Sequence, residues 1–123
     1  MSRAAPPARP GGHELAPGVT IGGDALPVIA GPCVIEGEER TLEAAEAVAG
    51  MASRLGVPIL FKASFDKANR SSIDSERGPG LETGLEILGA VKRQLGLGIL
   101  TDVHEPAQCE PTAEVCEVLQ IPA

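Results

Sequence analysis

The 123-residue sequence contains no tryptophan or tyrosine and only two phenylalanines. It therefore lacks the aromatic platform on which proteins stack single-stranded nucleic acids. Basic residues are also scarce: 10 lysines and arginines stand against 17 acidic residues, and the net charge is −7. Such a balance excludes the basic face of a general nucleic-acid binder. No apolar run reaches the roughly 18 residues that a membrane-spanning helix needs. Small molecules remain as the expected partners.

Cysteine is sparse as well, with three residues and no C-x-x-C pair. This argues against a disulfide framework and against a structural zinc site. The first residues contain no apolar core of a secretory signal, so we expect a cytoplasmic location. Residues 1–17 are rich in Pro, Ala, Arg and Gly. This composition predicts a flexible tail before a single domain at 18–123.

From residue 18 onward, short apolar runs alternate with stretches of helical period. We predict a hairpin in which 19–21 pairs with the start of 26–30 across a turn at 22–24. Strands are then predicted at 27–31, 57–61, 97–100 and 118–121, and helices at 38–55, 81–95 and 106–115. The alternation indicates a parallel sheet, with strands buried on both faces and covered by helices. A doubly wound open sheet and half of a (β/α) barrel both fit, and the final strand without a following helix favours the half barrel.

Polar side chains gather after each predicted strand, where both architectures place their functional groups. The segment 62–77 has four basic and three acidic residues, so it is locally positive in an acidic chain. Lys62, Lys67 and Arg70 suit a phosphate ester, and Ser64, Asn69 and Ser71 offer hydrogen bonds for sugar hydroxyls. The alternative is an ordinary solvated loop. Lys62 argues against that alternative because it directly follows an apolar strand.

Two further strand ends carry reactive side chains. Cys33 is interpreted as a buried small hydrophobe, as a nucleophile or as a soft metal ligand, and spacing alone favours the first. Asp102 and His104 alternate along an extended segment, so their side chains share one face. That arrangement suits a polar lining or a proton relay, or merely an ordinary strand-end cap.

Taken together, the strand-end segments resemble 3-deoxy-D-manno-octulosonate 8-phosphate synthase, also called 2-dehydro-3-deoxyphosphooctonate aldolase. The run K-A-S-F-D-K-A-N-R-S-S at 62–72 distinguishes this family from the 3-deoxy-arabino-heptulosonate 7-phosphate synthases. The matching segments are I-A-G-P-C-V-I-E at 29–36, F-K-A-S-F-D-K-A-N-R-S-S-I at 61–73, R-G-P-G-L-E at 77–82, T-D-V-H-E at 101–105 and L-Q-I-P-A at 119–123.

The resemblance implies a (β/α)8 TIM barrel, of which this chain would be the N-terminal hairpin and first four strands. Family members are typically tetramers. They condense phosphoenolpyruvate with arabinose 5-phosphate and water, release inorganic phosphate and supply lipopolysaccharide synthesis. This chain alone would be inactive. Two alternatives are a heptulosonate phosphate synthase and a non-catalytic phosphate-binding module that is complete at this length.

The resemblance also implies site residues. Lys62, Lys67 and Asp102 would be catalytic. The substrate-binding set would be Lys62, Ser64, Lys67, Asn69, Arg70, Ser71, Asp102, Gln120, Pro122 and Ala123. Cys33 would mark the metal-dependent class, as a ligand of Zn, Fe or Mn whose other ligands lie in the second half of the barrel. Asp74 departs from the family, which usually has His there, and an added anion would weaken phosphate binding.

Overall fold

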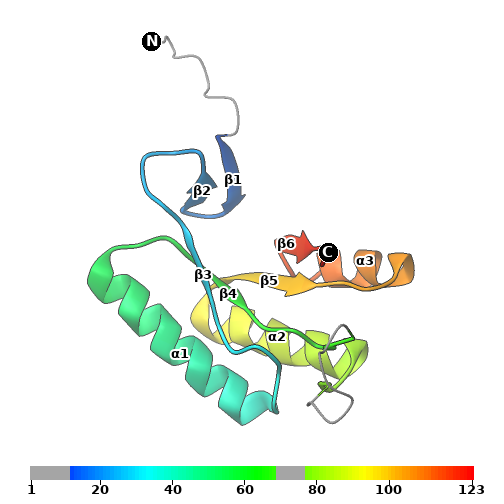
Figure 1. Ribbon diagram of the computed structural model, residues 1–123. Coiled ribbons are helices and arrows are strands. Elements are labelled where there is room, and N and C mark those ends of the chain that lie inside the picture. The colour runs from blue at the N-terminus through cyan, green and yellow to red at the C-terminus, as the bar shows by residue number, and fades with distance from the viewer. Residues whose placement is uncertain (1–11, 69–76) are drawn as a thin grey trace.

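The computed structural model describes residues 12–68 and 77–123, which form two sheets and three helices (Figure 1). A two-stranded antiparallel sheet pairs β1 with β2, and a four-stranded parallel sheet has the order β3-β4-β5-β6. The elements are β1 (His13–Ala16), β2 (Val19–Ile21), β3 (Val28–Ala30), α1 (Glu38–Leu55), β4 (Ile59–Lys62), α2 (Leu81–Leu95), β5 (Gly98–Asp102), α3 (Pro106–Ala113) and β6 (Val118–Gln120).

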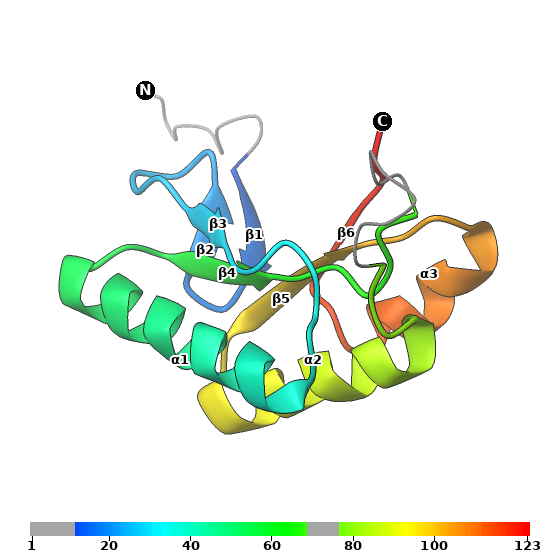
Figure 2. The same cartoon turned by 60° about the horizontal axis from the view of Figure 1, so that its bottom comes forward.

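The helices cover one face of the parallel sheet (Figure 2). Phe61 of β4 and Ile99 of β5 point to this face and pack with Ala45 of α1 and Leu88 and Val91 of α2. All five side chains are fully buried. A doubly wound sheet would reverse its strand order and place helices on both faces. In the described residues the order is sequential and the helices lie on one face.

The opposite face is partly covered by the β1–β2 hairpin, which packs Ala16 and Val19 against Leu60 of β4. The predicted hairpin was wrong: β2 pairs with β1, and 28–30 joins the parallel sheet instead. The reason lies at Pro17-Gly18, which separates the two strands. Proline followed by Gly18 at φ +80° is the combination that a type II turn requires. The glycine pair at 22–23 is a competing turn signal in the same stretch of sequence.

Strand β1 also changes the expected domain boundary. His13–Ala16 is ordered strand, so the tail predicted at 1–17 is wrong for these four residues. Residues 1–11 lie outside the described part. Burial of every strand on both faces is likewise wrong for β3, where Val28 is 37% and Ile29 is 50% exposed. β3 is an edge strand, and the hairpin packs on Leu60 of β4 and Val118 of β6 rather than on Ile29.

The two long helices have the predicted bounds, 38–55 and 81–95. Each ends at a glycine in the left-handed conformation, Gly56 and Gly96, whose N–H groups close the last turn. The third helix ends at Ala113, two residues before the predicted end. Among the described helices, none combines the length and apolarity required to cross a membrane.

Candidate active site

Backbone hydrogen bonds join the four strand ends in two pairs, β3 with β4 and β5 with β6. The N–H of Ile35, beyond β3, donates to the carbonyl of Ser64, beyond β4, at 3.0 Å. The N–H of Val103, after β5, donates to the carbonyl of Gln120 at 3.0 Å. Gly31 lies so close to β4 that an added Cβ would be 1.8 Å from the Lys62 carbonyl oxygen. Only glycine fits there, and the polar segments are consequently held side by side.

Ser64, Lys67 and Asp102 form a hydrogen-bonded chain across two of these segments. The Ser64 hydroxyl, fully buried, donates to Oδ1 of Asp102, and Nζ of Lys67 donates to Ser64 Oγ at 3.4 Å. Asp102 is only 4% exposed. A buried carboxylate needs donors to replace its hydration, and Ser64 supplies one. The chain therefore places a cation, a hydroxyl and an anion in sequence.

His104 extends this cluster. Its Nε2 lies 3.1 Å from Oδ2 of Asp102, within reach of an ion pair when the imidazole is protonated. The contact does not meet hydrogen-bond geometry, and this buried nitrogen has no hydrogen-bond partner among residues 12–68 and 77–123. Phe65 meets the imidazole edge to face, with ring centroids 6.1 Å apart. The Asp102 and His104 side chains therefore meet, as their expected shared face predicts.

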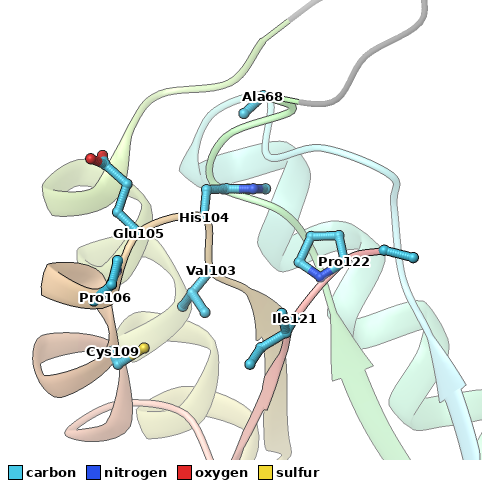
Figure 3. A pocket seen from close by; sticks show the side chains of 9 residues that line it. Ala68, Val103, His104, Glu105, Pro106, Cys109, Ile121 and Pro122 are labelled. Atoms are coloured by element: carbon cyan, nitrogen blue, oxygen red, sulfur yellow. The ribbon is translucent and has the colours of Figure 1, made fainter.

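A cavity of about 550 Å³ opens beside His104. Figure 3 shows the imidazole extending toward the space between Ala68 and Pro122, while the Glu105 carboxylate points away. Val103, Pro106, Cys109, Ile121 and Ala123 complete the lining. Pro122 and Ala123, both expected in a substrate pocket, thus line a cavity beside the polar cluster.

Lys62 and Gln120 share the sheet face that carries Asp102. Asp102 is in register with Gln120, and Lys62 is in register with Leu100, two residues before Asp102 on the same face. The helices pack against the other face. Both side chains are half-buried, and Lys62 has no ion-pair or hydrogen-bond partner within the described ranges. Within this part of the chain, no acidic side chain is paired with Lys62.

Cys33 is exposed, which overturns its interpretation as a buried hydrophobe. By contrast Cys116 is buried, and burial, reinforced by the Glu117 carboxylate and opposed by Lys92, raises the pKa of its thiol to about 12. Cys116 is therefore inert as a ligand or nucleophile. In the described part of the chain, no group of three or more His, Cys, Asp or Glu side chains is arranged to hold a metal.

Three expected substrate ligands, Asn69, Arg70 and Ser71, lie outside the described residues, as does Asp74. Two contributors were missed by the sequence analysis. Oε1 of Gln108 accepts the N–H of His104 at 2.7 Å and thereby fixes the turn that presents the imidazole. Its signal was the E-x-x-Q capping pattern at 105–108 with proline at the first helical position. Phe65, the ring against His104, carried no signal beyond its place in a motif.

The fold and this site define a class of protein: an α/β protein whose parallel strands present a buried acid, lysines and a histidine at their carboxyl ends. Comparison with known families gives the particular family. The sequence profile described as the DAHP synthetase I family matches residues 6–123. The chain belongs to this family.

Individual proteins that are similar to this chain have a more specific name than the family. The chain is 61% identical over 101 residues to a 2-dehydro-3-deoxyphosphooctonate aldolase of Desulfatibacillum aliphaticivorans, covering 82% of the chain and 37% of that protein. Proteins with the same name in Synechococcus sp. and Geotalea daltonii are 57% identical over 103 residues and 53% identical over 106 residues. These matches cover 82% and 85% of the chain, and 36% and 39% of the two relatives. The resemblance indicated by the strand-end motifs is confirmed, and the chain spans less than two-fifths of these relatives.

Proposed function

We propose that this chain is the amino-terminal half of a (β/α)8 barrel that condenses phosphoenolpyruvate with arabinose 5-phosphate. A bond forms between C3 of phosphoenolpyruvate and the aldehyde carbon of the sugar. Water adds at C2, and the bond between C2 and the phosphate ester oxygen breaks. Inorganic phosphate leaves with that oxygen, and the other product is 3-deoxy-D-manno-octulosonate 8-phosphate. The names of the relatives support this reaction over a heptulosonate synthesis.

The observation that carries the proposal is the position of the polar cluster. Lys62, Lys67, Asp102 and Gln120 come from three neighbouring strand ends on the side of the sheet that the helices leave open. In a (β/α)8 barrel that side is the interior, and substrates bind at the carboxyl ends of its strands. Sequential strand order and one-sided helices support the half barrel. The remaining strands would come from sequence corresponding to the rest of the relatives.

Each described residue has a proposed task in this reaction. Lys62 and Lys67 bind the phosphate and carboxylate of phosphoenolpyruvate as cations. Ser64 accepts a hydrogen bond from the Lys67 ammonium and donates one to the Asp102 carboxylate, so it holds these two side chains beside each other. A proton released by the water that adds at C2 passes through the Asp102–His104 pair, whose nearest atoms lie 3.1 Å apart, to the aldehyde oxygen as it becomes a hydroxyl. Gln120, Pro122 and Ala123 border the space between the two substrates.

The proposed metal is compatible with Cys33 only as a first ligand. Cys33 is exposed, and its backbone carbonyl accepts the N–H of Ser64 at 3.4 Å, so this residue lies next to the Ser64 segment. The described residues provide no further clustered ligands, so the rest of the set must come from outside them. A bound Zn, Fe or Mn would orient substrate and water. A homotetramer in the cytoplasm is part of the same proposal.

Calorimetry tests the function on the whole protein, with this chain extended to the length of its relatives. With added divalent metal we expect binding of phosphoenolpyruvate and, once arabinose 5-phosphate is present, release of inorganic phosphate. Lys67→Gln should weaken phosphoenolpyruvate binding about tenfold or more. Arg93→Gln, at an exposed base on α2, is the matched control and should leave binding unchanged. Failure of the whole protein to bind either substrate would refute the proposal.

A heptulosonate synthase is the second candidate, favoured by the description of the matching family. Replacing arabinose 5-phosphate with erythrose 4-phosphate distinguishes the two, since only the heptulosonate enzyme should turn over the shorter sugar rapidly. The 123-residue chain alone should release no product. Phosphate release by that purified chain would show that the second half of the barrel is dispensable.

A further inference from the structure

An ion pair joins the two sides of the segment that follows β4. Nε of Arg77 donates to Oδ1 of Asp66 at 2.7 Å, and Nη2 lies 3.4 Å from Oδ2. The guanidinium thus faces the carboxylate with two nitrogens, the arrangement in which Arg is most selective. Of the four basic residues that made 62–77 locally positive, Arg77 is therefore already neutralised by an acid of the same segment.

Backbone contacts join the same two sides. The N–H of Lys67 donates to the carbonyl of Arg77 at 2.6 Å, and the N–H of Gly80 donates to the carbonyl of Phe65 at 2.9 Å. An added Cβ at Gly78 would be 2.6 Å from the Phe65 carbonyl oxygen, so the backbones at Phe65 and Gly78 are in close contact. Asp66 and Lys67 are consequently held from both sides: by the side chain of Arg77 and by its carbonyl group.

The pair contributes little to stability. The Arg77 side chain is 58% exposed, and water and salt screen the attraction between exposed charges, so such ion pairs add little stability. Its hydrogen bond to Asp66, together with the charge of that carboxylate, raises the pKa of the guanidinium and keeps it charged. The Arg77–Asp66 pair has a defined geometry, with two guanidinium nitrogens on one carboxylate, but adds little to the stability of the fold. Its geometry is therefore better explained by the residues that it positions.

We propose that Arg77 and Asp66 are positioning residues for Lys67, and that the pair sets the affinity for the anionic group of phosphoenolpyruvate. The inference rests on the proposed function. Arg77 holds residues 66 and 67 where Nζ of Lys67 reaches Ser64, and it neutralises the adjacent carboxylate. Without Arg77, the Asp66 anion would repel the phosphate and compete with Ser64 for the Lys67 ammonium.

The test uses the whole protein and phosphoenolpyruvate as the titrant. Arg77→Gln should raise the Kd for phosphoenolpyruvate about tenfold and raise KM while leaving kcat nearly unchanged. Arg77→Lys, which keeps the charge, should restore most of the affinity. Adding Asp66→Asn to Arg77→Gln should also restore affinity, because the uncompensated anion is gone. Arg40→Gln removes another exposed Arg–Glu pair, with Glu36, and serves as the matched control.

Phosphoenolpyruvate binding by the wild type tests the proposed function, and binding by Arg77→Gln tests the role of the Arg77–Asp66 pair. If wild type binds phosphoenolpyruvate and Arg77→Gln binds it equally well, the inference is wrong and the proposed function stands. The inference is also wrong if Arg77→Gln lowers the melting temperature by several degrees and neither rescue restores binding, since the role is then structural. Absence of binding by wild type would overturn the function and the inference together.

Discussion

The two faces of the parallel sheet are built from alternating residues of the same strands yet have different contents. On the helix side, Phe61 and Ile99 are fully buried among Ala45, Leu88 and Val91. On the other side, apolar residues occupy one end, under the hairpin, and charged or polar residues occupy the other. Leu60 and Lys62, two positions apart on β4, show the change within a single strand.

The two faces therefore differ in which properties their side chains must have. The helix face is a core whose side chains need only shape and apolarity. The open face combines a hairpin cap at one end with a hydrogen-bonded acid at the other. Since residues two apart on a strand share a face, packing on one side and chemistry on the other can vary independently. Substitutions on the helix face should therefore change stability, and those at the polar end should change activity.

The largest effect is expected from Phe61→Ala on the helix face. Removing a fully buried ring leaves a cavity among α1, α2 and the sheet, and should lower the free energy of unfolding by about 3–5 kcal/mol. Urea denaturation measures the loss. Thr83→Ala, at an exposed position of α2, is the control and should change stability by less than about 0.5 kcal/mol. A loss below about 1 kcal/mol at Phe61 would mean that this face is not the core.

Asp102→Asn should give the next largest effect, on catalysis rather than stability. The amide cannot hold a proton as the carboxylate does and offers His104 no charge, so kcat/KM of the whole enzyme should fall about 100-fold or more. Phosphate release gives the rate.

Thr101→Val is the matched control because Thr101 is the preceding residue and points to the opposite face. Its hydroxyl donates to the Ala63 carbonyl at 2.7 Å, so the loss should cost about 1 kcal/mol of stability with kcat/KM retained. Equal activity of the wild type and Asp102→Asn would remove Asp102 from the proposed chemistry.

The sequence predicted the bounds of the helices better than it predicted which strands pair and which faces are covered. The bounds of α1 and α2 followed from helical period and terminal glycines, which are local signals. The pairing of β2 was missed because two turns competed, and Pro17-Gly18 formed the hairpin. The exposure of Ile29 was missed because an apolar run does not reveal whether its second face is covered.

For the site, strand-end position alone grouped Lys62, Asp102 and Gln120 correctly on one edge of the sheet. The Ser64–Asp102 hydrogen bond and the Phe65–His104 contact were not predictable, because they join segments 38 and 39 residues apart and depend on side-chain rotamers. The pairing of Arg77 with Asp66 was also hidden, since charge counts do not show which charges meet.

Ile29→Ala tests whether the open face of β3 is covered in the whole protein, because Ile29 is half exposed in this chain. In the 123-residue chain alone the substitution should cost less than about 1 kcal/mol. In the whole protein, where a closed barrel would cover this side chain, it should cost about 2–4 kcal/mol. Denaturation of both proteins, each with and without the substitution, measures the two costs. Equal small costs would contradict the closed barrel.

The smallest effect concerns Glu117, at the opposite end of the sheet from the active-site cluster. Its carboxylate accepts from the Lys92 ammonium and, at 2.9 Å, from the N–H of Ile99. Burial works to raise the pKa of this carboxyl, but these hydrogen bonds and the Lys92 charge outweigh burial and lower it below its ordinary value of 4.5. A lowered pKa stabilises the folded state above the unfolded-state pKa, and the stabilisation is lost as pH falls through the folded-state pKa.

Glu117→Gln should therefore destabilise the protein by about 1 kcal/mol at neutral pH, and the difference from wild type should shrink once pH falls below 4.5. Urea denaturation of both proteins at a series of pH values measures this convergence. Asn is not a useful replacement because it is shorter and would also lose the Ile99 contact, whereas Gln keeps an oxygen at the same reach. A difference that stays constant from neutral pH down to the acid limit would show that the charge of Glu117 beside Lys92 contributes nothing to stability.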